Sequence, residues 1–246
     1  MLDFTSRLSV ASMFSYAGWR ATSRAAPVTL GLKSGPRFEL RPNSSGNNDY
    51  GVAYEVFVHE YYNDRGRIPG DVKLIVDLGV NVGYSLLYFL HKWPNCRIIG
   101  FEPHPHHFAQ AARNLVLDGS SARVRLHDKA AGARTRPARL TDSRSSSSVI
   151  ETSSADTLNI EIVDIFPVLE REHIDILKMD IEGGEYEILA DDRFEQLDID
   201  VIVMEWHSRG NGAEDKTWCK QRLESFGFNI EEFIAEPSWG MFWATR

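Results

Sequence analysis

The side chains best suited to chemistry lie in the segment IDILKMDIEGGEYEIL, residues 174–189. An apolar run carries Lys178, Asp180 and Glu182 into a turn that contains two glycines, which allow close approach of the backbone. On an extended chain these three side chains lie on one side. Polar groups at the end of a buried strand are costly without partners, which favours a functional site. The alternative is an ion-paired strand end in which Lys178 neutralises Asp180.

A second set of candidates follows the apolar run at 201–204, where Glu205 and His207 end the next strand. A neutral imidazole is available near pH 7, so His207 is the first candidate for a general base. A lone histidine is more often structural, but this one lies at the expected ligand edge of the sheet. Asp180 or Glu205 is the alternative, either as the base or as the group that orients His207. Lys178 would stabilise negative charge on an acceptor or simply pair with Asp180.

The stretch LIVDLGVNVGYS, residues 74–85, has the pattern of a buried strand, a glycine turn and the start of a helix. Such a turn places backbone N–H groups and a positive helix end beside a ligand. It contains Asp77, Gly79, Asn81 and Gly83 but lacks the GxGxxG of a dinucleotide site, which argues against a pyrophosphate. A plain turn that needs glycine only for packing is the competing interpretation.

Glu102 ends the next predicted strand, in the sequence IIGFEPHP. An acid at this place can accept hydrogen bonds from both hydroxyls of a ribose, and its distance from Asp77 suits one βαβ unit. The three nearby histidines, His104, His106 and His107, stand at a helix start and are expected to be surface residues rather than metal ligands.

Alternating strands and helices from residue 70 onward predict a mostly parallel sheet covered by helices on both faces. Ligands of such sheets bind beyond the carboxyl ends of the strands. The predicted strands are Leu74–Asp77, Arg97–Phe101, Val124–His127, Ile174–Met179, Val201–Met204, Asn229–Phe233 and Met241–Thr245, and the predicted helices are Tyr84–Trp93, Pro105–Asp118 and Thr217–Phe226.

Residues 1–69 are expected to form an N-terminal helical extension or cap, and residues 70–246 the main domain. Within the extension we predict a packed first helix, rather than a targeting segment, a strand at Arg37–Leu40 and a helix over Tyr50–Tyr62. The serine-rich patch Ser143–Ser148 is interpreted as a mobile loop.

The chain has 246 residues, a net charge of −8 and 43% hydrophobic residues, which suits one large α/β domain with an extension. The acidic balance argues against a nucleic-acid partner. Two distant cysteines suggest a reducing cytoplasmic setting, and no apolar run is long enough to span a bilayer.

With these residues laid out, the chain resembles the FkbM-type S-adenosylmethionine-dependent methyltransferases over about residues 37–210. The resemblance is carried by VDLGVNVGYS, GFEPHPHHFAQAARNL and, most specifically, DILKMDIEGGEYEIL. Val80 departs from it, since the family usually has a small residue there, and the segment 134–159 matches weakly.

The resemblance implies a Rossmann-like class I methyltransferase fold with a seven-stranded sheet that ends in an antiparallel strand pair. Asp77, Gly79, Asn81 and Gly83 would surround the methionine part of S-adenosylmethionine, with Asp180 beside it. Glu102 and Pro103 would lie at the ribose, and Asp128 and Lys129 at the adenine. The acceptor would be a small molecule or a glycan, methylated on a hydroxyl of a sugar or natural product. A homodimer is compatible with this interpretation.

The catalytic set from this interpretation is His207, Asp180, Glu205 and Lys178. Asp180, Glu182 and His207 could instead hold a divalent metal that acidifies the hydroxyl. We expect no metal, because their spacing is not a known metal signature. Two other classes remain open: a nicotinamide-dependent oxidoreductase, which the absent GxGxxG disfavours, and a catalytically silent S-adenosylmethionine-binding protein, which the acids at the strand ends disfavour.

Overall fold

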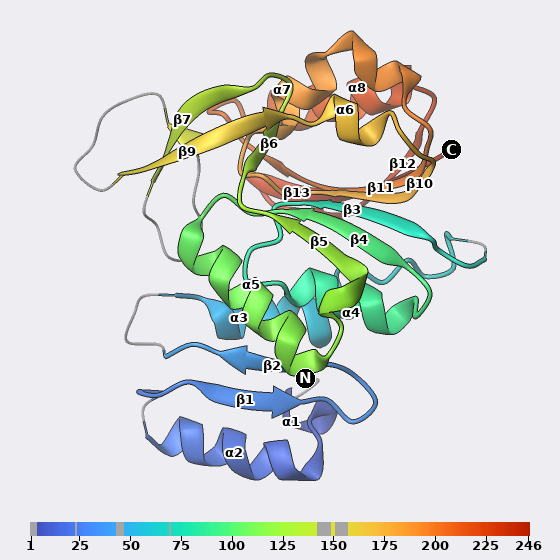
Figure 1. Cartoon of the computed structure of the whole chain (residues 1–246). Helices are drawn as coiled ribbons and strands as arrows, with labels where there is room; N and C mark the ends of the chain where they lie inside the picture. Colours follow the sequence, from blue (N-terminus) through green and yellow to red (C-terminus); the bar gives the residue numbers. More distant parts are fainter. Residues whose placement is uncertain (1–3, 23, 43–46, 69, 142–148, 151–156) are drawn as a thin grey trace.

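A twisted seven-stranded sheet runs through the middle of the computed structural model (Figure 1). The structure describes residues 4–22, 24–42, 47–68, 70–141, 149–150 and 157–246. In sheet order the strands are β12 (Asn229–Ala235), β13 (Trp239–Thr245), β11 (Ile199–His207), β10 (Ile174–Met179), β3 (Leu74–Leu78), β4 (Arg97–Phe101) and β5 (Val124–His127).

The five strands from β11 to β5 are parallel, whereas β13 runs antiparallel to β11 and pairs with β12 as a hairpin. This arrangement confirms the predicted Rossmann-like class, including the final antiparallel pair. The predicted strands all form, and several extend by one to a few residues beyond the predicted bounds. Such shifts are expected, because terminal residues pair only when a neighbouring strand reaches them.

Successive residues of the central strands point to opposite faces and build two separate cores. Ile75 and Ile176 belong to the core on one side, and Val76 and Leu177 to the core on the other. The helices of the first face are α3 (Asp49–Phe57), α4 (Tyr84–Lys92) and α5 (Pro105–Asp118). The other face is covered by α6 (Phe166–Leu169), α7 (Glu185–Ala190) and α8 (Ala213–Ser225) (Figure 1).

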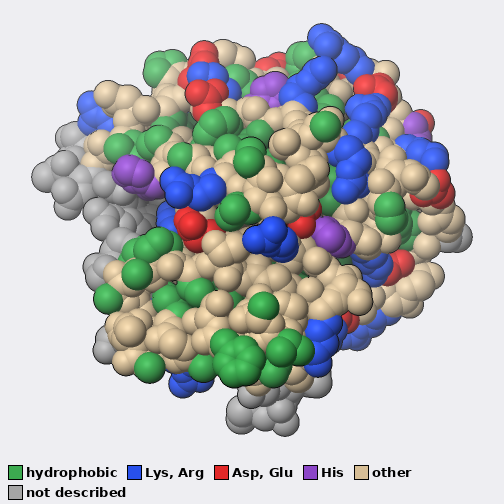
Figure 2. Space-filling model, turned by 60° about the horizontal axis from the view of Figure 1, so that its bottom comes forward, with side chains coloured by type: hydrophobic (Ala, Val, Ile, Leu, Met, Phe, Trp, Pro, Cys, Tyr) green, Lys and Arg blue, Asp and Glu red, His purple; other side chains and the backbone are tan. Residues whose placement is uncertain are grey.

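The N-terminal extension is less helical than predicted. It contains α1 (Phe4–Arg7) and α2 (Val10–Ala21), and then an antiparallel hairpin of β1 (Val28–Gly31) and β2 (Arg37–Leu40). The sequence analysis did not assign Val28–Gly31 to a strand; these residues form β1 because the chain turns back and pairs with β2. Phe4, Leu8 and Tyr16 are buried in the same core as α4, so the extension packs directly on the first face of the sheet. Its outward face, turned forward in Figure 2, leaves apolar side chains of α2 exposed.

The part of the chain between β5 and β10 forms a second, smaller sheet, which the sequence analysis did not predict. Its order is β6 (Ala130–Gly132), β9 (Thr157–Asp164), β7 (Arg136–Thr141) and β8 (Val149–Ile150). The predicted serine loop at Ser143–Ser148 lies outside the described residues. Among the described residues, no helix is long and apolar enough to cross a membrane.

Candidate functional site

A cavity of about 380 Å³ opens where the carboxyl ends of β3, β4 and β10 meet the small sheet. Its volume is in the range of pockets that hold small-molecule cofactors. Its lining combines apolar side chains, such as Phe101, Ala130 and Ile162, with polar and charged ones. The described residues that line it are Gly79, Asn81, Phe101, Glu102, Pro103, His107, Ala130, Ala131, Arg136, Leu140, Ile162, Asp180, Ile181, Glu182, Gly183, Gly184, Glu187 and Arg209.

The glycine turn after β3 is packed tightly against the end of β10. Gly79 has φ +88°, and a Cβ there would lie 1.8 Å from the backbone oxygen of Asp180. Only glycine permits this approach, because any side chain would collide with the backbone. Asn81 and Glu182, which both line the cavity, are non-glycine residues with positive φ, +53° and +54°. Backbone strain of this kind gathers at binding sites.

Glu102 is held rigidly at the floor of the cavity. It is 6% exposed, and its carboxylate accepts hydrogen bonds from the backbone N–H of Asn81, at 2.7 Å, and of His104, at 2.9 Å. Burial raises the pKa of Glu102 to about 7, although both hydrogen bonds oppose the shift. Each oxygen keeps a free lone pair, so the group can still accept hydrogen bonds from a diol.

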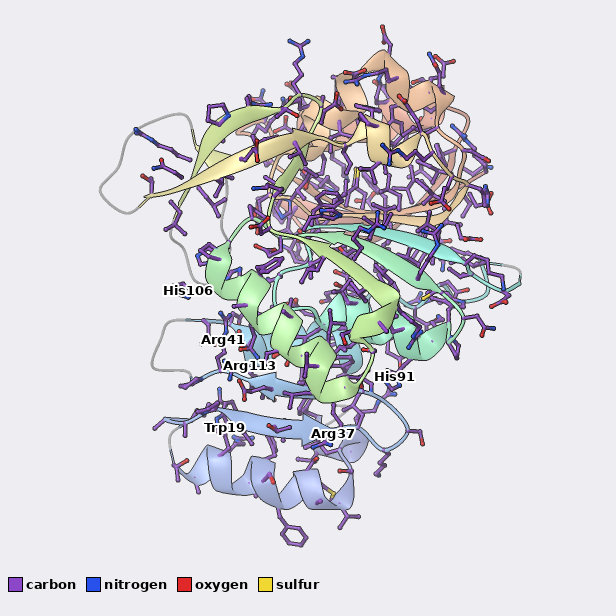
Figure 3. The ribbon with its side chains drawn as sticks, in the orientation of Figure 1. Trp19, Arg37, Arg41, His91, His106 and Arg113 are labelled. Carbon is purple, nitrogen blue, oxygen red and sulfur yellow. The ribbon has the colours of Figure 1, made fainter. Side chains whose placement is uncertain are left out.

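The histidines after Glu102 are not all at the surface, contrary to the prediction. His104 and His107 are 0% and 3% exposed, and their rings stack with centroids 4.3 Å apart. His107 lies 3.8 Å from the Glu102 carboxylate and lines the cavity. His106 alone is exposed, at the start of α5 (Figure 3). His104 and His107 are three positions apart and share the inward face of the helix start, which the sequence analysis did not predict.

Lys178 and Asp77 form a buried ion pair under the glycine turn. Lys178 Nζ lies 3.1 Å from Asp77 Oδ1 and 3.6 Å from Asp180 Oδ2, and it donates to the backbone oxygen of Gly79. Ser85 donates a hydrogen bond to Asp77 at 2.6 Å. Burial alone would lower the pKa of Lys178, but Asp77 raises it, so the amine stays charged. The pair therefore ties β3, β10 and the turn together.

Glu185, the second acid of the EGGE sequence, stabilises the turn between β10 and α7. It is 0% exposed at the start of α7, and its carboxylate accepts hydrogen bonds from the N–H groups of Ile181 and Gly183, both at 2.8 Å. These two donors would otherwise be left without partners in the tight turn. Glu185 thus fixes the shape of the turn that carries Glu182.

His207 is surrounded by carboxylates at the end of β11. Its Nε2 lies 3.3 Å from Glu205 and 3.5 Å from Glu182, and its Nδ1 lies 3.6 Å from Glu185. Burial alone would lower the pKa of His207, but Glu185 and Glu205 raise it to about 11. The neutral imidazole expected of a base is therefore disfavoured near pH 7.

The pKa of Glu205 is also raised, but for a carboxyl group this shift favours the neutral form. Burial, reinforced by the charge of Asp180, raises its pKa to about 7, while His207 opposes the shift. A carboxylate with this pKa is matched to proton transfer at neutral pH. The ligand atoms of Asp180, Glu205 and His207 lie within 4.8 Å of one another, close enough to chelate a divalent cation. Glu205 takes the place in this set that the sequence interpretation gave to Glu182.

A second cavity of about 160 Å³ adjoins the first. Gly79, Asn81, Asp180 and Glu182 line both cavities, so the two meet at the ends of β3 and β10. Residues of the N-terminal extension close its other side. The described residues that line it are Asn48, Val52, Glu55, Val56, Tyr61, Tyr62, Gly79, Val80, Asn81, Tyr84, Ser85, Lys178, Asp180, Glu182 and Glu205.

Several predicted site residues lie elsewhere. Asp77 and Gly83 line neither cavity: Asp77 is buried behind Lys178, and Gly83 packs on α5, where a Cβ would meet Ala111 at 3.0 Å. Asp128 and Lys129 follow β5 but line neither cavity, and Lys129 lies 3.1 Å from Glu161. Their predicted roles at the methionine and the adenine gain no support from these positions.

The sequence interpretation missed residues on both cavities. Glu55, Tyr61 and Tyr62 lie far upstream of the motifs, and only the helical periodicity of the segment hinted that it packs on the domain. Arg209 lines the larger cavity with its guanidinium 3.7 Å from the Tyr186 ring centre. Its position two residues after His207 was the signal available.

Comparisons with known proteins show that the sequence is similar to methyltransferases. Residues 77–235 match the family model described as the methyltransferase FkbM domain. "Methyltransferase 1" of Beauveria bassiana is 28% identical over 213 residues, which cover 75% of this chain and 82% of the relative. "Methyltransferase sdnD" of Sordaria araneosa is 28% identical over 222 residues, or 74% and 83% of the two chains.

Solved structures share the fold. The M. jannaschii TYW2 complex with AdoMet has a TM-score of 0.50 at 14% identity and covers 89% of this chain and 85% of that chain. The putative transferase PH0793 of Pyrococcus horikoshii has a TM-score of 0.50 at 12% identity and covers 89% and 71%. At these identities the likeness concerns the fold alone.

Proposed function

The chain belongs to the FkbM methyltransferase family and uses S-adenosylmethionine, and from this premise we propose that it methylates a hydroxyl of a sugar, glycan or natural product. The larger cavity suits this cofactor. Its apolar side chains would contact the purine, and Glu102 has free lone pairs for a ribose diol. Asn81 and Asp180, which also line this cavity, would lie at the amino-acid part.

The observation that carries the proposal is the junction of the two cavities. The cofactor supplies a methyl group on a sulfonium sulfur, and transfer needs the acceptor oxygen in line behind that methyl. Gly79, Asn81, Asp180 and Glu182 border both cavities, so a methyl at the junction would face an acceptor in the smaller one. The residues at the junction thus hold both reactants in one geometry.

We assign the proton transfer to Glu205. It lines the acceptor cavity, and its raised pKa suits a base at neutral pH. Bound S-adenosylmethionine would supply the methyl group, and the Glu205 carboxylate would accept the proton that leaves the acceptor hydroxyl. His207, held protonated by its acidic neighbours, orients that carboxylate and keeps it partly ionised. His207 is then a positioning residue rather than the base.

The test compares Glu205→Gln with His207→Gln. Removal of the base should lower kcat by about 10²–10⁴-fold while the affinity for S-adenosylhomocysteine is unchanged. His207→Gln should keep measurable turnover. Because Glu205 loses a stabilising cation, its pKa should rise, so the increase of kcat with pH should occur at higher pH. Full activity of Glu205→Gln, or abolished turnover in His207→Gln alone, would return the base to His207.

The metal alternative is tested on the same protein. We expect activity to survive dialysis against EDTA, because Asp180 and Glu205 also have cationic partners in Lys178 and His207. Loss of activity that Mg²⁺ or Mn²⁺ restores would replace the carboxylate base with metal activation of the hydroxyl.

A further inference from the structure

The smaller cavity holds more negative charge than its own cations balance. Glu55, Asp180, Glu182 and Glu205 line it, and the only lining cation among the described residues is Lys178. Buried carboxylates without compensation disfavour their ionised forms and favour any cation that enters.

Lys178 does not provide that compensation for the whole cavity. Its ammonium lies closest to Asp77, which is outside the cavity, and it also donates to the backbone oxygen of Gly79. His207 lies beside Glu182 and Glu205 but does not line the cavity. These two cations therefore leave Glu55, on the α3 side of the cavity, without a positive partner among the described residues.

Glu55 lines the cavity from α3. It is half-buried, and its carboxylate forms no hydrogen bond or ion pair with any residue that the structure describes. Burial, reinforced by Asp180, raises the pKa of Glu55. Tyr61 and Tyr62 flank it in the cavity lining, so a small ligand there would be enclosed by aromatic rings and carboxylates.

Resting on the proposed function, we propose that Glu55 selects acceptors that carry a protonated amine near the hydroxyl to be methylated. The ammonium would donate to Glu55 and offset the excess charge of the cavity, while the hydroxyl faces Glu205 and the methyl. Acceptors with a carboxylate or phosphate at that place would be repelled. Glu55 is thus a specificity-determining residue from outside the sheet.

The test uses three cofactor analogues that reach into the acceptor cavity. In each, nitrogen replaces the sulfur and bears a three-carbon arm that ends in an amine, a hydroxyl or a carboxylate. Calorimetry should show the amine arm binding about tenfold or more tighter than the hydroxyl arm, and the carboxylate arm weakest. Glu55→Gln should remove the amine preference and leave S-adenosylhomocysteine affinity unchanged.

The matched control is Glu60→Gln, a carboxylate of the same segment that pairs with Arg7 and does not line the cavity. It should keep the preference. A preference that persists in Glu55→Gln, or a hydroxyl arm that binds as tightly as the amine arm, would overturn the inference. So would a hydroxyl-arm advantage that vanishes in EDTA, which would indicate a metal. Failure of S-adenosylhomocysteine itself to bind would overturn the proposed function as well.

Discussion

At the scale of single residues, the site is a set of charges whose roles depend on their neighbours rather than on their types. Glu185 and Glu205 keep His207 protonated by raising its pKa, while burial raises the pKa of Glu205 to about 7. Lys178, a catalytic candidate from its sequence position, is 2% exposed and tied to Asp77. We therefore assign it a structural role beneath the turn.

That role predicts the behaviour of Lys178→Met. The change leaves Asp77 buried without its cation and should lower the free energy of unfolding by about 3–5 kcal/mol. Adding Asp77→Asn should recover part of this loss, because the buried charge is then gone. Urea unfolding of the single and double variants provides the measurement. Normal stability of Lys178→Met together with lost turnover would instead indicate a direct catalytic role.

At the scale of elements, α3 links the N-terminal hairpin to the smaller cavity, which we propose holds the acceptor. Asp49, its first residue, is 3% exposed and accepts hydrogen bonds from the backbone N–H of Arg41 at 2.9 Å and from its guanidinium at 2.6 Å. These contacts fix the end of β2 to the start of α3 and so set the position of Glu55.

Asp49→Asn should loosen this connection. Loss of charge-assisted hydrogen bonds at a buried site should cost about 1.5–3 kcal/mol, and hydrogen exchange should become faster in residues 49–62. The acceptor KM should rise more than the cofactor Kd, because the larger cavity has no residue from α3. The partly exposed Arg7–Glu60 pair supplies the control, since Glu60→Gln should cost less than about 1 kcal/mol. Equal losses in both variants would contradict a special role for Asp49.

At the scale of the whole molecule, the raised pKa values make stability depend on pH. Glu102 and Glu205 have pKa values of about 7 when folded, so the folded state binds more protons than the unfolded chain between about pH 4.5 and 7. His207, with a pKa of about 11, does the same between about pH 6.5 and 11. For all three groups, stability is highest below the unfolded pKa and falls as pH rises through the folded value.

The ligand-free protein should therefore melt at a lower temperature at pH 8.5 than at pH 5.5. A difference of at least about 1 kcal/mol corresponds to about 2–4 °C for a chain of this size. Differential scanning calorimetry at constant ionic strength measures it, and Glu205→Gln should reduce the slope. A melting temperature that rises over this interval would mean that the buried acids are not protonated as described.

The sheet could be predicted from the sequence because each strand is recognisable from its own few residues. Each central strand is a short apolar run, and Ile75 and Val76 show how alternation assigns the two faces. The position of the larger cavity could also be predicted, because Asp180 and Glu102 follow the carboxyl ends of parallel strands, which meet at one edge of the sheet. The burial of His104 and the charge of His207 could not be predicted, because they depend on residues brought together only by folding. The same holds for Glu55, whose pKa is raised by burial and by the charge of Asp180, a residue far away in the chain.

The cavity residues come from two separate parts of the chain, and this has a consequence for how acceptor preference can change among related enzymes. The groups that we propose to hold the cofactor and move the proton come from β3, β4, β10 and β11 or the turns after them, whereas one side of the proposed acceptor cavity comes from residues 48–62. Exchange of that single stretch between homologous enzymes should transfer acceptor preference while leaving the reaction intact. A library of such chimeras would explore new acceptors without risk to the catalytic groups.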